Sequence, residues 1–181
     1  SYWLMIHVAV IVGSYGPFAL SMIIGIVVLL LMVLTNRKNK KIMNLNINEL
    51  SIVNELSMTV GLIMLTIGNF LGGMWANESW GRYWGWDPKE TWALISIMVY
   101  AFVIHMRIIP GLKSNFTFNV ASILSFASII MTYFGVNFYL SGLHSYAAGD
   151  PMPIPDFVPY SIIIVFITAS LAFYKQKTLQ K

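Results

Sequence analysis

Five long apolar runs constrain this sequence more than any other feature, because a helix needs roughly 20 apolar residues to cross a bilayer. The runs cover approximately residues 4–34, 56–74, 88–109, 116–140 and 159–174. Charged residues make up only 10% of the chain, whereas they make up about a quarter of an average soluble domain. The sequence therefore predicts an all-α, polytopic membrane helix bundle with about five transmembrane helices, organised as a single membrane domain over residues 1–181.

Basic residues mark alternate ends of these runs and so predict how the bundle is oriented. They lie within residues 37–41, at Arg107 and Lys113, and at Lys175, Lys177 and Lys181. The positive-inside rule places these ends on the cytosolic side, which makes the N-terminus external and the C-terminus cytosolic. The same distribution accounts for the net charge of +4 without a nucleic-acid partner. Because the chain opens on Ser-Tyr-Trp with no initiator Met, we expect it to be part of a longer polypeptide.

A short amphipathic pattern separates the first two apolar runs. Within residues 47–56, apolar side chains recur about every three residues among Asn and Glu. This spacing is typical of an amphipathic helix. It predicts a short helix over 47–56 that lies on the membrane surface.

The segment 75–92, WANESWGRYWGWDPKETW, holds five of the six tryptophans of the chain. The orientation predicts that it is an external loop between the second and third spans. Tryptophan combines a large apolar face with one N–H donor, and one or two would form an ordinary interfacial belt. Five at this spacing favour a platform for a flat apolar ligand with a polar edge. Asp87, Pro88 and Glu90 also form a helix-start signal, which by itself explains both acidic residues.

Three histidines are the candidate metal ligands of a chain that has no cysteine. His7 opens the first run and His144 follows the fourth, so both are expected at the external end, level with the segment 75–92. Two imidazoles from opposite sides could ligate the iron of a flat macrocycle such as haem. His105 is expected about 17 residues into the third helix, roughly 25 Å from its start. It therefore lies near the cytosolic end, and if it binds haem it does so at a second site, separate from His7 and His144. The alternative for each is a hydrogen-bonded interfacial histidine.

The run WGRYWGWDPKETWALI resembles the tryptophan-rich WWD motif of haem-handling membrane proteins. The order of the histidine signals LMIHV, VIHMR and GLHSY matches as well. On these motifs the chain is similar to the C-terminal part of the CcsA (ResC) family of system II cytochrome c biogenesis, over essentially its whole length. The resemblance implies that haem b, as a transported substrate, is presented to apocytochrome c on the external face. It further implies a ResB-type partner protein, or a fused N-terminal region, and contact with membrane lipid.

The resemblance also implies roles for individual residues. His7 and His144 would be the axial ligands of the haem iron, and His105 would belong to a haem-entry site whose partner histidine lies outside this sequence. The residues expected to contact haem in addition are Trp75, Trp80, Trp84, Trp86, Asp87, Trp92 and Arg82. Arg82 and Lys89 are the candidate partners for the haem propionates, although Lys89 could equally be a surface charge.

The expected activity is a share in a cytochrome c synthase (haem lyase) complex, in which the apocytochrome supplies the thiols. Catalysis would consist mainly of positioning, and we identify no general acid or base. One alternative is a transporter or exporter of haem or another amphiphile with no ligation role, and another is a b-type electron-transfer subunit. The expected location is the bacterial inner (plasma) membrane, with the thylakoid membrane as second choice.

Overall fold

The computed structural model describes residues 2–143 and 153–180, and every regular element in these ranges is a helix. The elements are α1 (Tyr2–Leu34), α2 (Lys40–Trp80), α3 (Pro88–His105), the 3-10 turn η1 (Met106–Ile108), α4 (Asn115–Ile130), the π-helical turn η2 (Met131–Gly135), α5 (Val136–Tyr139) and α6 (Phe157–Gln180). Among the described residues, five helical stretches are long and apolar enough to span a membrane. The predicted all-α membrane bundle is confirmed, and the chain is an integral membrane protein.

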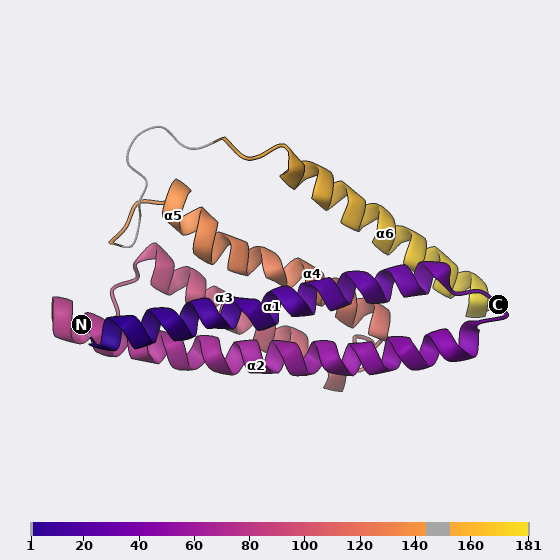
Figure 1. Cartoon of the computed structure of the whole chain (residues 1–181), viewed down its shortest axis with the longest axis horizontal. Coiled ribbons are helices and arrows are strands. Elements are labelled where there is room, and N and C mark those ends of the chain that lie inside the picture. The colour runs from indigo at the N-terminus through magenta and orange to yellow at the C-terminus, as the bar shows by residue number, and fades with distance from the viewer. Residues whose placement is uncertain (1, 144–152, 181) are drawn as a thin grey trace.

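Helices α1 and α2 run antiparallel and side by side along most of their length (Figure 1). Helices α3 and α4 pack against this pair, and α6 contacts α1 and α4. Phe18, Tyr100 and Phe118 are completely buried where α1, α2, α3 and α4 meet. Helix α6 is different, because Ala172 is its only buried side chain among those described. Its N-terminal half accordingly stands away from α5 (Figure 1).

The two ends of the bundle differ in chemistry. Helix α1 starts, α2 ends and α3 starts at one end (Figure 1), which therefore carries the segment 75–92. The basic turn between α1 and α2 lies at the opposite end, beside the C-terminal end of α6. Lys40 Nζ donates a hydrogen bond of 2.9 Å to the carbonyl of Leu179 and ties these two segments together. The basic turn and the segment 75–92 thus lie at opposite ends of the bundle, and the orientation of the bundle in the membrane stays a prediction.

The structure corrects the expectation of a separate surface helix over residues 47–56. These residues lie inside α2, which runs without interruption for 41 residues. Ile47 and Ser51 are buried against neighbouring helices instead of facing a membrane surface. The reason is local, because residues 40–60 contain no Gly or Pro and nothing in them ends a helix. A helix of this length spans roughly 60 Å, about twice the hydrocarbon thickness of a bilayer.

A buried network of amides and hydroxyls joins α1, α2 and α4. Asn54 lies at its centre: Asn54 Oδ1 accepts from Ser21 Oγ at 2.5 Å, and Asn54 Nδ2 donates to Asn119 Oδ1 at 2.8 Å and to Ser122 Oγ at 2.9 Å. Asn119 Nδ2 also donates to Ser51 Oγ at 2.8 Å. All five side chains are completely buried. In lipid, where apolar burial drives helix association only weakly, such interhelical hydrogen bonds fix which helices pair.

We expect Asn54→Leu, which keeps about the same side-chain volume, to lower the free energy of unfolding by about 1–3 kcal/mol. The change removes three hydrogen bonds of a kind that contributes roughly 0.6 kcal/mol each, on average, within a bilayer. The control is Asn46→Leu, an exposed position on the same helix, where the effect should stay below about 0.5 kcal/mol. Unfolding by SDS in mixed micelles measures both, and equal stabilities for the two variants would contradict a structural role for the network.

Candidate functional site

The connection between α2 and α3 is shorter than the predicted external loop over residues 75–92. Helix α2 continues to Trp80 and ends at Gly81, which has a left-handed φ of 69° and donates its N–H to Asn77 O at 3.0 Å. Glycine is favoured there because it adopts this conformation without steric cost. Trp75 and Trp80 therefore belong to α2 and Trp92 to α3, and only residues 81–87 form the turn.

The start of α3 is fixed by a capping box, as the sequence predicts. The Asp87 carboxylate accepts from Lys89 N at 3.1 Å, and Glu90 Oε2 accepts from Asp87 N at 3.2 Å and from Gly85 N at 2.7 Å. Arg82 Nη1 pairs with Glu90 Oε1 at 3.5 Å. The Arg82 guanidinium lies directly on Gly85, where any Cβ would overlap it. Arg82 and Glu90 therefore hold the turn in one conformation.

Trp86 is the most exposed tryptophan of the segment 75–92. Its side chain is 71% exposed, and its φ of 57° is in the left-handed region that bulky residues rarely adopt. Trp84 meets it edge to face, with ring centroids 5.7 Å apart. Backbone strain of this kind concentrates at functional sites, and here it turns the Trp86 ring outward from the bundle.

Asp87 also connects the turn to the end of the fourth span. Its Oδ1 accepts a hydrogen bond of 2.7 Å from Leu143 N. A Cβ on Gly142 would come within 2.6 Å of the same oxygen, so the chain after α5 passes directly over the start of α3. His144 follows immediately in the sequence but lies outside the described residues. The predicted pairing of His7 with His144 therefore stays a prediction.

His7 is held by α2. Its Nδ1 lies 2.8 Å from the carbonyl oxygen of Gly68. A carbonyl only accepts, so Nδ1 carries the proton and the lone pair of the neutral ring lies on Nε2. The His7 ring is nearly parallel to Trp75, with an interplanar angle of 9° and ring centroids 6.4 Å apart. Its close approach to α2 depends on Gly72, because a Cβ there would come within 2.7 Å of His7 Nδ1.

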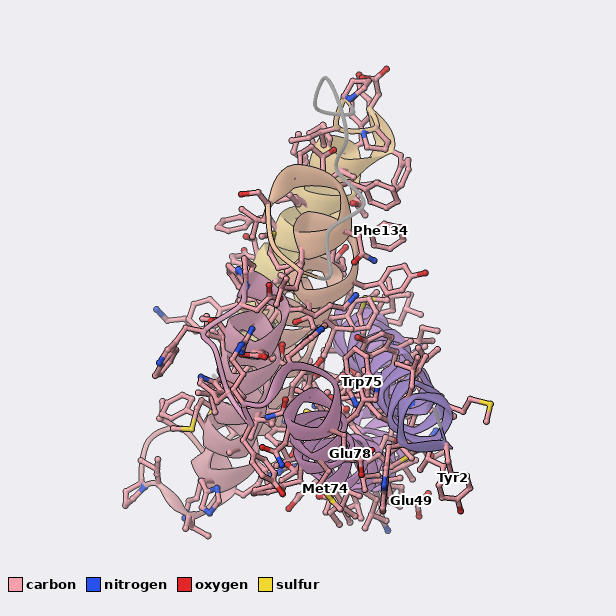
Figure 2. The ribbon with its side chains drawn as sticks, turned by 90° about the vertical axis from the view of Figure 1, so that its left-hand side faces the viewer. Tyr2, Glu49, Met74, Trp75, Glu78 and Phe134 are labelled. Atoms are coloured by element: carbon pink, nitrogen blue, oxygen red, sulfur yellow. The ribbon has the colours of Figure 1, made fainter. Side chains whose placement is uncertain are left out.

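A cavity of about 490 Å³ opens beside this histidine at the same end of the bundle. Its size falls within the range of small-molecule sites, about 300–1,000 Å³. The wall contributed by α1, α2 and the turn is aromatic: His7, Tyr15, Trp75, Trp80, Tyr83 and Trp84. Seen along the bundle from this end, Trp75 lies toward the middle of the helices and Tyr2 at their edge (Figure 2).

The opposite wall is polar and comes from α3, η2 and α5. Lys89, Glu90, Thr132 and Asn137 line it together with Tyr133. Of these, the sequence analysis named only Lys89 as a candidate ligand contact and explained Glu90 by helix capping alone. No local signal could have indicated the others. Thr132 and Tyr133 lie in the π-helical turn Met131–Gly135, and Asn137 follows it directly. Such a distortion is frequent at functional sites.

Thr132 anchors this turn on α3. Its hydroxyl lies 3.1 Å from Trp92 O and 3.0 Å from Ser96 Oγ, and the side chain is 1% exposed. Trp92 thus contributes its backbone carbonyl to this anchor. Of the other residues predicted to contact the ligand, Arg82, Trp86, Asp87 and Trp92 are not among those lining the cavity.

His105 lies far from this cavity, in the last turn of α3. It is exposed, and its Nδ1 lies 2.7 Å from Ala101 O one turn earlier in the same helix. The expected separation of His105 from His7 is therefore present. His7, on α1, lies at the end of the bundle where α3 begins, and His105 lies where α3 ends.

Comparison with known proteins identifies relatives for most of the chain. The model of the cytochrome C assembly protein family matches residues 1–144. Protein NrfI of Wolinella succinogenes is 53% identical over 153 residues, which are 84% of this chain and 17% of that protein. Cytochrome c biogenesis protein CcsA of Chlamydomonas reinhardtii is 39% identical over 81% of this chain and 41% of its own length. The CcsA of Prochlorococcus marinus is 38% identical over 81% of this chain and 54% of its own length. The chain thus spans at most about half of these relatives.

The contact between Gly72 and His7 gives a direct test of the site's packing. We expect Gly72→Ala to lower the thermal midpoint in detergent by several degrees, because overpacking costs about 1–3 kcal/mol. Gly13→Ala is the matched control, since the flexible end of Met64 is all that its new Cβ would meet, at 3.1 Å. That variant should be unchanged or more stable, because alanine favours helices. A Gly72→Ala protein as stable as the control would show that His7 does not pack against α2 in this way.

Proposed function

This chain belongs to the cytochrome c assembly protein family, and from that membership we propose that it takes part in cytochrome c maturation by holding haem and presenting it to apocytochrome c. The site is the cavity beside His7. The haem is haem b, handled as a substrate. The apocytochrome provides both thiols, and the lack of cysteine in this sequence agrees with that division of roles.

The observation that carries this proposal is the setting of His7. Histidines that ligate metals usually donate their other ring N–H to a carboxylate or a backbone carbonyl, which fixes the tautomer and the ring orientation. His7 has this arrangement, with Nδ1 on the carbonyl of Gly68 at 2.8 Å. Trp75, Trp80 and Trp84 add aromatic surface next to it, as a porphyrin face requires. The residues present therefore fit a haem.

We propose His144 as the second axial ligand. Leu143, which precedes it in the sequence, is tied to Asp87 at the start of α3 and lines the same cavity as His7. Iron held between two imidazoles is coordinatively saturated, so the protein would orient the ring and leave its vinyl groups for the incoming thiols. Each thioether bond then forms by adding one S–H across one vinyl group, and positioning supplies most of the acceleration.

We assign His105 to a second haem station at the basic end of the bundle. Its Nδ1 is engaged with Ala101 O, which again leaves the lone pair of the neutral ring on Nε2. By the positive-inside rule this end faces the cytosol, and the His7 cavity then faces outward. This arrangement suits a bacterial inner membrane, or a thylakoid membrane as second choice. A ResB-type protein or a fused N-terminal region would complete the synthase.

The test is the haem spectrum of the purified assembly. We expect His7→Ala to lose the low-spin, bis-imidazole spectrum and to bind haem at least roughly tenfold more weakly, because one iron–nitrogen bond is missing. Added imidazole should restore the spectrum in that variant, and His144→Ala should behave alike. The control is Met5→Ala, an exposed neighbour on α1, which should resemble the wild type. A His7→Ala protein with the wild-type spectrum and affinity would refute the ligand assignment.

Reconstitution with apocytochrome c separates presentation from transport alone. The wild-type assembly, supplied with reduced haem and a reduced apocytochrome, should yield cytochrome with haem attached covalently, and His7→Ala should yield markedly less. The measurement is haem staining after denaturing electrophoresis. Unchanged attachment by His7→Ala would favour a haem exporter with no ligation role.

A further inference from the structure

The cavity contains a lysine, Lys89, that forms no direct ion pair with a carboxylate of the described residues. Lys89 and Glu90 are, respectively, the lysine and the carboxylate that line this cavity. Glu90 is already engaged, since it pairs with Arg82 and accepts from the backbone N–H groups of Gly85 and Asp87. Within residues 2–143 and 153–180, Lys89 forms no ion pair. The wall formed by α3 and α5 therefore presents a positive charge to the cavity.

The position of this ammonium is well defined. Lys89 Nζ donates to Asn137 Oδ1 at 2.8 Å and lies 5.8 Å from the centre of the Tyr133 ring. Asn137 is 5% exposed, and the π-helical turn just before it places both partners on this wall. An ammonium has three N–H donors, so further donors remain on Lys89 after the bond to Asn137.

Two more donors face the same space. The Asn137 side chain accepts through Oδ1, which leaves its Nδ2 amide without a hydrogen bond to any described residue. The hydroxyl of Tyr15 lines the cavity and is buried with no hydrogen-bond partner in the described part of the chain. Buried polar groups in native proteins are normally paired. A ligand bound in the cavity with suitably placed acceptor atoms would pair with these donors.

We propose that Lys89 and Asn137 bind a carboxylate of the ring ligand, which is a propionate if that ligand is haem. This inference rests on the proposed function and deepens it, because it assigns the orientation of the ring: propionate toward α3 and α5, iron toward His7. The charge-assisted bond from an ammonium to a carboxylate is stronger than a neutral one, especially away from bulk water. Arg82, which is equally charged and seven residues away, is excluded because Glu90 holds it outside the cavity.

The experiment compares ferric protoporphyrin IX with its dimethyl ester, in which both carboxylates are methylated and uncharged. Binding to the purified full-length assembly in a non-ionic detergent is followed by absorbance. The wild type should bind the free acid at least roughly tenfold more tightly than the diester. Lys89→Met should lose this preference by weakening the free acid alone, and Lys89→Arg should retain most of it.

Asn137→Asp provides a second variant that does not remove the lysine. The new carboxylate would stand where Asn137 Oδ1 now accepts from Lys89, so it would pair with the ammonium and repel a propionate. Its preference for the free acid should fall at least as far as that of Lys89→Met. The matched control is Lys113→Met in the α3–α4 connection, whose preference should equal that of the wild type. Gel filtration and helical circular dichroism establish that each variant is folded.

The outcomes separate this inference from the function on which it rests. If the wild type binds neither porphyrin, the proposed function fails. If it binds both equally, or if Lys89→Met and Asn137→Asp keep the wild-type preference, the carboxylate site is wrong while haem binding stands. Loss of the preference in both variants, with Lys113→Met unchanged, supports the site.

Discussion

The close approach of α1 to α2 is the constraint on which the rest of the structure depends. Three glycines on one face of α2 permit it: Gly61 receives Phe18, Gly68 receives Ile11 and Gly72 receives His7, and a Cβ at any of them would come within 3.0 Å of its partner. Small residues at helix interfaces play this part in membranes, where packing replaces the hydrophobic effect as the driving force. The approach also brings His7 to the carbonyl of Gly68. The same packing that holds the bundle together thus orients the candidate ligand.

In the turn over residues 81–87, single side chains likewise make several structural contacts at once. Glu90 caps α3, closes the turn through Gly85 and holds Arg82. Asp87 caps α3 and also receives the chain that follows α5. Arg82, Asp87 and Glu90 therefore hold the turn and the start of α3 in place. Lys89 and Glu90 both line the cavity, but Glu90 is engaged by the turn and Lys89 forms no ion pair with a described residue. Replacing Asp87 would therefore disturb the site although Asp87 itself does not line the cavity.

Much of the architecture could be predicted because its signals are local. Five apolar runs, a helix start at Asp87-Pro88 and the opposite placement of His7 and His105 follow from length and sequence order. The sequence could not predict that residues 47–56 continue into α2, because an amphipathic pattern indicates a helix but not whether a tertiary partner covers it. Nor could the sequence distinguish the role of Lys89 from that of Arg82. Arg82 pairs with Glu90 within the same segment, whereas Lys89 bonds to Asn137, 48 residues further along the chain. The π-helical turn that brings Asn137 to Lys89 has no recognised sequence signature here.

The interior of the bundle bears on how a ligand could pass between the ends marked by His105 and His7. Between those ends, Phe18, Tyr100 and Phe118 fill the space among α1 to α4 and are completely buried, with the rings of Phe18 and Tyr100 stacked 3.9 Å apart. The Asn54 network occupies the neighbouring layer. A porphyrin is far larger than any gap that close packing leaves. His105 is exposed on the outer face of α3, so a route along the lipid-facing surface needs no opening of this core, whereas a route through its middle would require α1 to separate from α2.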